Sequence, residues 1–202
     1  MGKEELRKRL NWQNMSGIKA TSAETDFYTV FHTLFEGNEY ELIEKPKHLK
    51  NLYASVELPQ SVLSQIYIPD IDLNKTKWGV SPDFAITNTN TGKIIFGEIK
   101  RQDGWVEGKK PNAGRGNAHE RMCKLFAPGL QKTYRKIGKI NDPCFLPFWV
   151  VFQGDITRDP KRNREISFWF DEFPHNFFMW RPQDQSDKLV EHFITYIQPY
   201  LE

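Results

Sequence analysis

The stretch between Pro82 and Lys100 constrains the fold of this chain more than any other. Two apolar runs, at 83–87 and 93–100, are separated by the polar segment Asn88-Thr-Asn-Thr-Gly92. Short apolar runs divided by a polar turn that ends in glycine are typical of a β-hairpin. The sequence therefore predicts two antiparallel strands joined by a tight turn.

The predicted hairpin carries charged side chains at its far ends. Asp83 begins the first strand, while Glu98 and Lys100 lie near the end of the second. Antiparallel pairing returns the chain to its start, so the carboxylates of Asp83 and Glu98 should lie close together. Because side chains alternate along a strand, Glu98 and Lys100 should share one face. Two neighbouring carboxylates repel, which predicts a cation beside them.

A pair of carboxylates with a nearby lysine is suited to cleaving phosphodiester bonds with a divalent metal ion. Mg²⁺ prefers oxygen ligands and is usually held by one or two carboxylates together with substrate phosphate. Lys100 could orient the attacking water or stabilise charge in the transition state, and the sequence leaves both roles open. The spacing alone is also compatible with an exposed edge strand that carries a surface ion pair.

The middle of the chain is strongly basic. Residues 100–139 hold eleven lysines and arginines against three acidic residues, whereas the remaining residues hold seventeen basic and twenty-three acidic ones. The small net charge of +2 thus conceals a basic centre with acidic flanks, a pattern expected of a protein that binds nucleic acid. A solvated helix face is the alternative. The basic excess begins at Lys100, which favours nucleic acid.

Residues 114–124 combine glycines with residue types that can read DNA. Asn117 could pair bidentately with adenine, Ala118 could contact a thymine methyl, and Arg115 or Arg121 could fork onto guanine or phosphate. The glycines on either side of Arg115 permit close backbone approach, and the helix start that follows offers N–H groups to phosphate. A glycine loop with an asparagine helix cap would give the same pattern.

Together these residues resemble a known family. Asp83, Glu98-x-Lys100 and the run Gly116-Asn-Ala-His-Glu-Arg121, in this order, are similar to the type II restriction endonucleases of the EcoRI-like group. The resemblance implies an α/β fold with a restriction-endonuclease-like core, in which helices flank a central five-stranded mixed sheet. It also implies Mg²⁺ as cofactor and a homodimer that acts on palindromic double-stranded DNA. A companion DNA methyltransferase would be a functional partner rather than a physical one.

Carried over by position, the resemblance assigns roles to individual residues. Asp83, Glu98 and the main-chain carbonyl of Ile99 would hold the metal ion, and Lys100 would serve the nucleophile. This group reads an inner AATT with a run similar to the one here, so inner-base contacts or the cross-subunit network that supports them are assigned to Asn117, Ala118, Glu120 and Arg121. Gly116 is assigned to DNA binding through close approach of its backbone.

Two residues of the same segment are assigned differently. Arg115 lies just before the shared run and is assigned to the outer C·G pair by chemistry alone, because bidentate arginine to guanine is the commonest specific contact. His119 occupies the variable position of the run and is interpreted as a spacer.

The expected activity is Mg²⁺-dependent hydrolysis of both strands of CAATTG after the first base, with 5′-phosphate ends. A structure-specific or repair nuclease could use the same Asp, Glu-x-Lys core, since a catalytic core does not fix the substrate. A non-catalytic DNA-binding protein would account for the basic middle. It would not account for two converging carboxylates, which repel phosphate unless a metal intervenes.

The 202 residues, 39% of them hydrophobic, suit a single domain over 1–202 that contains the catalytic hairpin 82–101 and the reading segment 114–124. No apolar run is long enough to span a bilayer and no secretory signal is evident, so a cytoplasmic protein without a membrane partner is expected. Cys123 and Cys144 have no partners at zinc-ligand spacing, so no structural zinc is implied.

The remaining pattern predicts several helices and one further strand. An apolar stripe of Phe27, Val30, Phe31 and Leu34 indicates an amphipathic helix. The aromatic run at 166–180 is interpreted as core or dimer packing rather than base stacking. Helices are predicted at 3–12, 22–35, 117–126, 130–137 and 186–197, with Pro128-Gly129 as a break and 148–153 as a strand central in the sheet.

Overall fold

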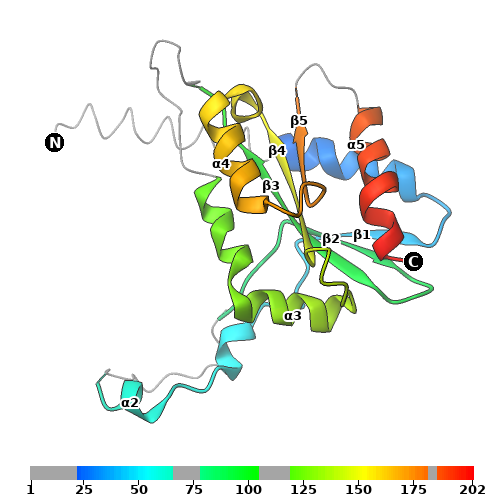
Figure 1. Ribbon diagram of the computed structural model, residues 1–202. Helices are drawn as coiled ribbons and strands as arrows, with labels where there is room; N and C mark the ends of the chain where they lie inside the picture. Colours follow the sequence, from blue (N-terminus) through cyan, green and yellow to red (C-terminus); the bar gives the residue numbers. More distant parts are fainter. Residues whose placement is uncertain (1–21, 66–77, 105–118, 182–185) are drawn as a thin grey trace, which may run out of the picture.

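The computed structural model describes residues 22–65, 78–104, 119–181 and 186–202. Within them, one sheet has the strand order β1-β2-β3-β4-β5 (Figure 1). Pairing is antiparallel from β1 to β3 and parallel from β3 to β5. The predicted five-stranded mixed sheet is thereby confirmed. Its strands are β1 Tyr40–Glu44, β2 Phe84–Asn88, β3 Ile94–Arg101, β4 Phe148–Gln153 and β5 Phe177–Trp180.

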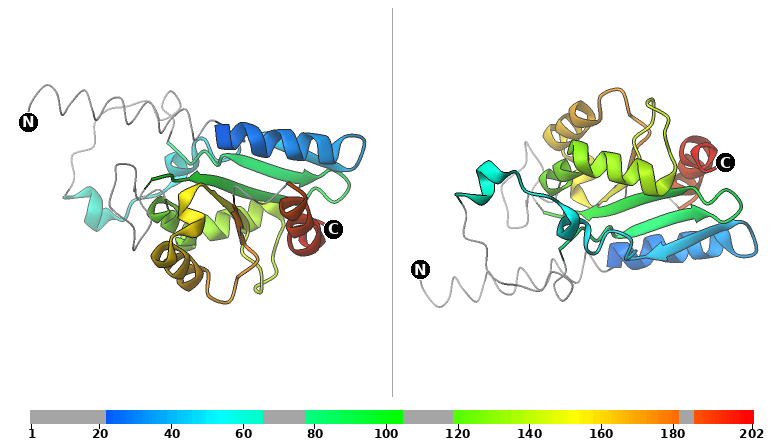
Figure 2. Two further views of the ribbon diagram at one scale, coloured as in Figure 1. Left: turned by 90° about the horizontal axis from the view of Figure 1, so that it is seen from above. Right: turned by 90° about the horizontal axis from the view of Figure 1, so that it is seen from below.

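Helices cover both faces of the sheet (Figure 2). Helical residues 22–35 and α5 pack on one face, while α3, α4 and the short helix η2 pack on the other. No helix in the described ranges is long and apolar enough to cross a membrane. The α-helices with labels are α2 Gln60–Leu63, α3 Pro128–Gly138, α4 Pro160–Phe170 and α5 Ser186–His192. The 3-10 helices are η1 Leu52–Ser55, η2 Glu120–Phe126, η3 Asp155–Arg158 and η5 Gln198–Tyr200, and η4 Phe193–Ile197 is a π-helix.

Strand β3 alternates between the two cores as predicted. Ile95 and Ile99 are buried in the core beneath the first described helix. Phe96 is buried on the opposite face, where its ring stacks on Tyr134 with the centroids 4.8 Å apart. Glu98, two residues beyond Phe96, belongs to that same face of the strand. The hairpin therefore inserts a carboxylate at the edge of an aromatic core.

The turn between β2 and β3 is built by its polar residues. The side-chain oxygen of Asn88 accepts hydrogen bonds from the main-chain N–H groups of Asn90 at 2.9 Å and Thr91 at 3.2 Å. Gly92 adopts φ 66°, a left-handed conformation that glycine tolerates without steric cost. The resulting register places Phe84 opposite Gly97, and the N–H of Asp83 donates to the Gly97 carbonyl at 3.0 Å. The predicted hairpin is confirmed.

Other sequence-based expectations met mixed outcomes. The helices at 22–35 and from Ser186 are confirmed, and β4 is an interior strand with all six residues buried, although β3 is the middle one. The predicted helix at 130–137 is confirmed within α3 and is separated from η2 as predicted, but the break lies at Ala127 and not at Pro128-Gly129. Pro128 instead opens α3, because the first helical position needs no N–H donor, and the extended residue is Ala127.

The predicted helix at 117–126 is present from Glu120 as the 3-10 helix η2, while its first two residues lie outside the described ranges. The predicted helix at 3–12 lies outside them as well.

Strands β1 and β5 and helix α4 were not predicted. The aromatic run at 166–180 contains the end of α4 and all of β5, and its interpretation as core is confirmed for Ile166 and Phe170, which are fully buried. Phe168 departs from this pattern, since it is 81% exposed. Dimer packing by this run stays a prediction.

The close packing at Gly97 yields a stability prediction. A Cβ atom on Gly97 would lie 2.0 Å from Cζ of the buried Phe84 ring, so Gly97→Ala should lower the free energy of unfolding by about 1–3 kcal/mol. Gly129→Ala on α3 is the matched control, because a Cβ atom there meets nothing within 4 Å. This control should be neutral or stabilise by about 0.4–1 kcal/mol. Urea denaturation measures both, and equal stabilities would contradict the packing argument.

Candidate active site

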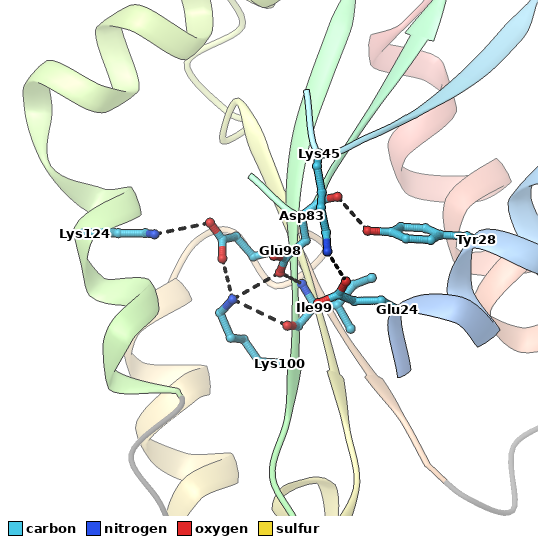
Figure 3. Close-up of polar contacts among 8 residues, drawn as sticks. All are labelled: Glu24, Tyr28, Lys45, Asp83, Glu98, Ile99, Lys100 and Lys124. Atoms are coloured by element: carbon cyan, nitrogen blue, oxygen red, sulfur yellow. Dashed lines mark hydrogen bonds and ion pairs between the residues drawn. The ribbon is translucent and has the colours of Figure 1, made fainter. Parts of the chain in front are cut away.

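The hairpin brings three of the predicted site residues to one point (Figure 3). Asp83 lies immediately before β2, and Glu98 and Lys100 project from β3. The Lys100 ammonium donates to Asp83 Oδ2 at 3.3 Å and also to Glu98 Oε2. The proximity of the two carboxylates, and the common face of Glu98 and Lys100, are therefore as the strand pattern predicts.

The main chain and a tyrosine hold Asp83 in place. Its Oδ2 atom accepts a hydrogen bond from the Ile99 N–H at 2.8 Å. Its carbonyl oxygen accepts from the Tyr28 hydroxyl at 2.8 Å and from the Lys45 N–H at 3.0 Å. Asp83 is thus anchored to β3, to the first described helix and to the end of β1. Such anchoring fixes the carboxylate before any ligand binds, which is what a catalytic site requires.

Glu98 lies between two lysines and is only 3% exposed. Its Oε2 atom accepts from Lys100, while Oε1 has no hydrogen-bond partner. The ammonium of Lys124 on η2 lies 3.4 Å from Oε1 and forms an ion pair with it without hydrogen-bond geometry. A buried carboxylate oxygen without a hydrogen bond is costly, so Oε1 is available to a further ligand.

Lys100 is a cation in this arrangement. Burial alone would lower its pKa, but the negative charges of Glu98 and Asp83 and their hydrogen bonds outweigh that effect and raise the pKa. At neutral pH the group therefore donates hydrogen bonds and does not accept protons.

The position of the Lys100 ammonium shows where oxygen atoms converge. Asp83 Oδ2, Glu98 Oε2 and the Ile99 carbonyl oxygen all lie within 3.4 Å of it. These are the three groups assigned to the metal. All are hard oxygen donors, which suits Mg²⁺. In the described part of the chain, no cluster of three or more His, Cys, Asp or Glu offers a metal site of another type.

The DNA-reading segment is described only at its end. Arg115, Gly116, Asn117 and Ala118 lie outside the described residues, whereas Glu120 and Arg121 are exposed at the start of η2. His119, interpreted from the sequence as a spacer rather than a ligand, is directed into the protein. Its side chain is fully buried, its Nε2 atom lies 3.2 Å from Glu165 Oε2, and its ring stacks on Trp169.

Sequence reasoning missed two contacts of the site. Lys124 belongs to the basic run and to the reading segment, but nothing local distinguishes the lysine that reaches Glu98 from its neighbours. Tyr28 follows Phe27 on the predicted amphipathic helix. Its hydroxyl was the available signal, since a buried tyrosine usually finds a hydrogen-bond partner.

Comparison with known proteins identifies the family. The family model described as "Type II restriction enzyme MunI" matches residues 1–202. A curated type II restriction enzyme MunI from Mycoplasma sp. is 65% identical over 202 residues, covering 100% of both chains. The chain belongs to the MunI family of type II restriction enzymes. The resemblance to this class of site-specific endonucleases is confirmed.

A solved structure supports the same conclusion for the fold of this MunI-family enzyme. The crystal structure of MunI restriction endonuclease in complex with cognate DNA superimposes with a TM-score of 0.81 and 64% sequence identity, covering 95% of this chain and 98% of that chain. The restriction-endonuclease-like core is thereby confirmed. Type II restriction enzymes generally need a divalent metal ion, which agrees with the converging oxygens of the site.

The lysine bridge between the carboxylates predicts a stability effect in the absence of metal. Replacement Lys100→Met removes the cation between the two carboxylates and leaves the buried Glu98 with Lys124 as its remaining ion-pair partner within the described part of the chain. The free energy of unfolding in chelator should therefore fall by about 3 kcal/mol. Adding Glu98→Gln should recover much of this loss, because the uncompensated charge is gone. Urea denaturation of the two single variants and the double variant gives the coupling. Additive effects would show that Lys100 does not stabilise Glu98.

Proposed function

We propose that this MunI-family enzyme hydrolyses both strands of palindromic double-stranded DNA with an AATT core in a Mg²⁺-dependent reaction. The expected site is CAATTG, cut after the first base to leave 5′-phosphate ends. The observation that carries the proposal is the convergence of Asp83 Oδ2, Glu98 Oε2 and the Ile99 carbonyl on one positive charge. The similar MunI structure with cognate DNA supports the substrate.

Asp83, Glu98 and the Ile99 carbonyl would hold the metal ion. When bound, the ion neutralises the negative charge that develops on the phosphate oxygens. The fit rests on the chemistry of the donors, which are all oxygen, and on Oε1 of Glu98, which is buried and accepts no hydrogen bond. The Ile99 N–H donates to the Asp83 carboxylate and the Tyr28 hydroxyl to its carbonyl, and these two contacts would keep Asp83 in position as a ligand.

Lys100 and Lys124 supply the positive charge that belongs to the chain itself. Lys100 is an ammonium ion with three donor protons, and it can stabilise the phosphate oxygens or orient the attacking water by donating to its oxygen. Lys124 is about half exposed and reaches Glu98 from η2, so it also faces the region a phosphate would approach. Together they offset the repulsion between the two carboxylates and the DNA backbone.

Specificity is proposed to come from the reading segment. Asn117 and Ala118 would contact the inner AATT, and Arg115 would contact the outer C·G pair. Gly116 would allow close approach of the backbone, and Glu120 and Arg121 would support the readers within or across subunits. A palindrome is matched by two-fold symmetry, so a homodimer is proposed. A DNA methyltransferase that protects the same site would act beside the enzyme without binding it.

Digestion of a sequenced plasmid by the purified enzyme tests this function. Reactions contain Mg²⁺ or a chelator, and the cut ends are sequenced. Cuts confined to CAATTG and present only with Mg²⁺ are expected. Discrete cuts at other AATT-centred sites would contradict the outer-pair assignment alone. Cutting without sequence preference would contradict the restriction site, and DNA binding without cutting would contradict the catalytic role of the carboxylates.

Removing one carboxylate should separate cleavage from binding. Asp83→Ala should abolish cleavage, because the metal loses a ligand and the lysine bridge loses one end. It should also strengthen binding of a CAATTG duplex in chelator, since one fewer negative charge faces the scissile phosphate. Gel-shift titration of Asp83→Ala beside the unaltered enzyme measures this. Equal or weaker binding by the variant would refute the electrostatic argument.

The outer base pair has its own test. If Arg115 contacts guanine bidentately, Arg115→Ala should lose about 1–3 kcal/mol of discrimination at that pair and keep its discrimination within AATT. Cleavage rates on duplexes altered at the outer or the inner pairs separate the two effects. A uniform loss on every duplex would instead assign Arg115 to a phosphate.

A further inference from the structure

His119 is the first described residue of the reading segment 114–124, and its side chain is directed into the protein. Its side chain is 0% exposed, and its ring stacks on Trp169 of α4 with centroids 5.4 Å apart and an interplanar angle of 17°. Its Nε2 atom lies 3.2 Å from Glu165 Oε2, also on α4. A residue that merely separated two functional neighbours would need none of these contacts.

The contact between His119 and Glu165 is polar and directional. Glu165 Oε2 also accepts from Arg162 at 2.5 Å, so the carboxylate joins the imidazole and the guanidinium. Burial first, and then the charge of Arg162, lower the pKa of His119, which keeps the ring neutral at pH 7. The carboxylate can only accept, so the single ring proton lies on Nε2, and Nδ1 is buried without a partner. These constraints fix the orientation of the ring.

The short helix η2 links this anchor to the catalytic hairpin. It begins at Glu120, directly after His119, and its Met122 and Leu125 are buried against the core that contains α4. Five residues beyond His119, the ammonium of Lys124 lies 3.4 Å from Glu98 Oε1. The reading segment is thus held on α4 at His119 and contacts the active site at Lys124, less than two helical turns later.

We propose that His119 is a positioning residue for DNA recognition, which fixes the middle of the reading segment on α4 through Glu165 and Trp169. The inference rests on the proposed function, because Asn117 and Ala118, the readers of the inner bases, directly precede it in the chain. Base-edge hydrogen bonds depend on donor and acceptor placement, so a reader whose anchor is lost contacts correct and incorrect pairs more equally. Arg115 precedes Asn117 in the sequence and is therefore farther from His119, so its placement should depend less on this anchor.

The test compares cleavage of CAATTG duplexes with duplexes altered at one inner or one outer pair, as ratios of kcat/KM. His119→Leu removes the donor and the aromatic ring but keeps apolar bulk. His119→Gln retains an amide donor at a reach similar to that of Nε2. Glu165→Ala removes the acceptor from a more exposed position, so it tests the same contact if His119→Leu folds poorly. Ile166→Val, at a buried position on α4, is a control for destabilisation alone.

The inner-pair ratio is kcat/KM on CAATTG divided by kcat/KM on a duplex altered at an inner pair, and the outer-pair ratio is defined likewise. In His119→Leu and Glu165→Ala the inner-pair ratio should fall at least about tenfold, while the outer-pair ratio changes less. In His119→Gln both ratios should stay within about threefold of those of the unaltered enzyme. Ile166→Val should lower the melting temperature without changing either ratio. The positioning role would be overturned if the unaltered enzyme discriminates between inner pairs and both His119→Leu and Glu165→Ala keep the same inner-pair ratio. If the unaltered enzyme itself failed to discriminate inner pairs, the proposed function would fail instead.

Discussion

The repulsion between Asp83 and Glu98 is the constraint around which the catalytic end of this enzyme is built. Antiparallel pairing of β2 and β3 places both carboxylates together, and Glu98 is nearly excluded from solvent. Lys100, Lys124 and the Ile99 N–H stabilise the negative charge of the two carboxylates. The Tyr28 hydroxyl and the Lys45 N–H donate hydrogen bonds to the main-chain carbonyl of Asp83. These contacts come from several separate parts of the chain. Charge compensation by Lys124 ties η2 to the hairpin, while hydrogen bonds to the Asp83 main-chain carbonyl tie the first described helix and the end of β1 to it.

The hairpin could be predicted because its signals are local. The strand alternation, the Asn88 turn and the glycine that ends it lie within twenty residues, and they also determine that Asp83, Glu98 and Lys100 meet. Strand β1 carries no such signal, and helix α4 has one only at its start, where Asp159 caps the main-chain N–H groups of Lys161 and Arg162. The apolar positions of β1 are few, and the aromatic residues of α4 and β5 form one continuous run that does not show where the helix ends and the strand begins. Tertiary pairing decides both.

The predicted site residues are likewise marked by local sequence signals, whereas the contacts that were missed depend on tertiary packing. Lys124 and His119 act through residues 26 and 46 positions away in the chain, Glu98 and Glu165. Their residue types fit many roles, and only the packing of η2 between the hairpin and α4 assigns one. His119 itself is held by buried contacts with Glu165 and Trp169 of α4.

Binding of the metal ion by Asp83, Glu98 and the Ile99 carbonyl is the central claim. A crystal structure of the enzyme with Mn²⁺, in which anomalous scattering locates the ion, tests this claim most directly. Mn²⁺ takes the same oxygen ligands as Mg²⁺ and can be distinguished from water. The account predicts one strong peak bound by Asp83, Glu98 and the Ile99 carbonyl, with the Lys100 ammonium moved out from between the carboxylates. A peak elsewhere, or Lys100 still bridging Asp83 and Glu98 in metal-saturated crystals, would contradict it.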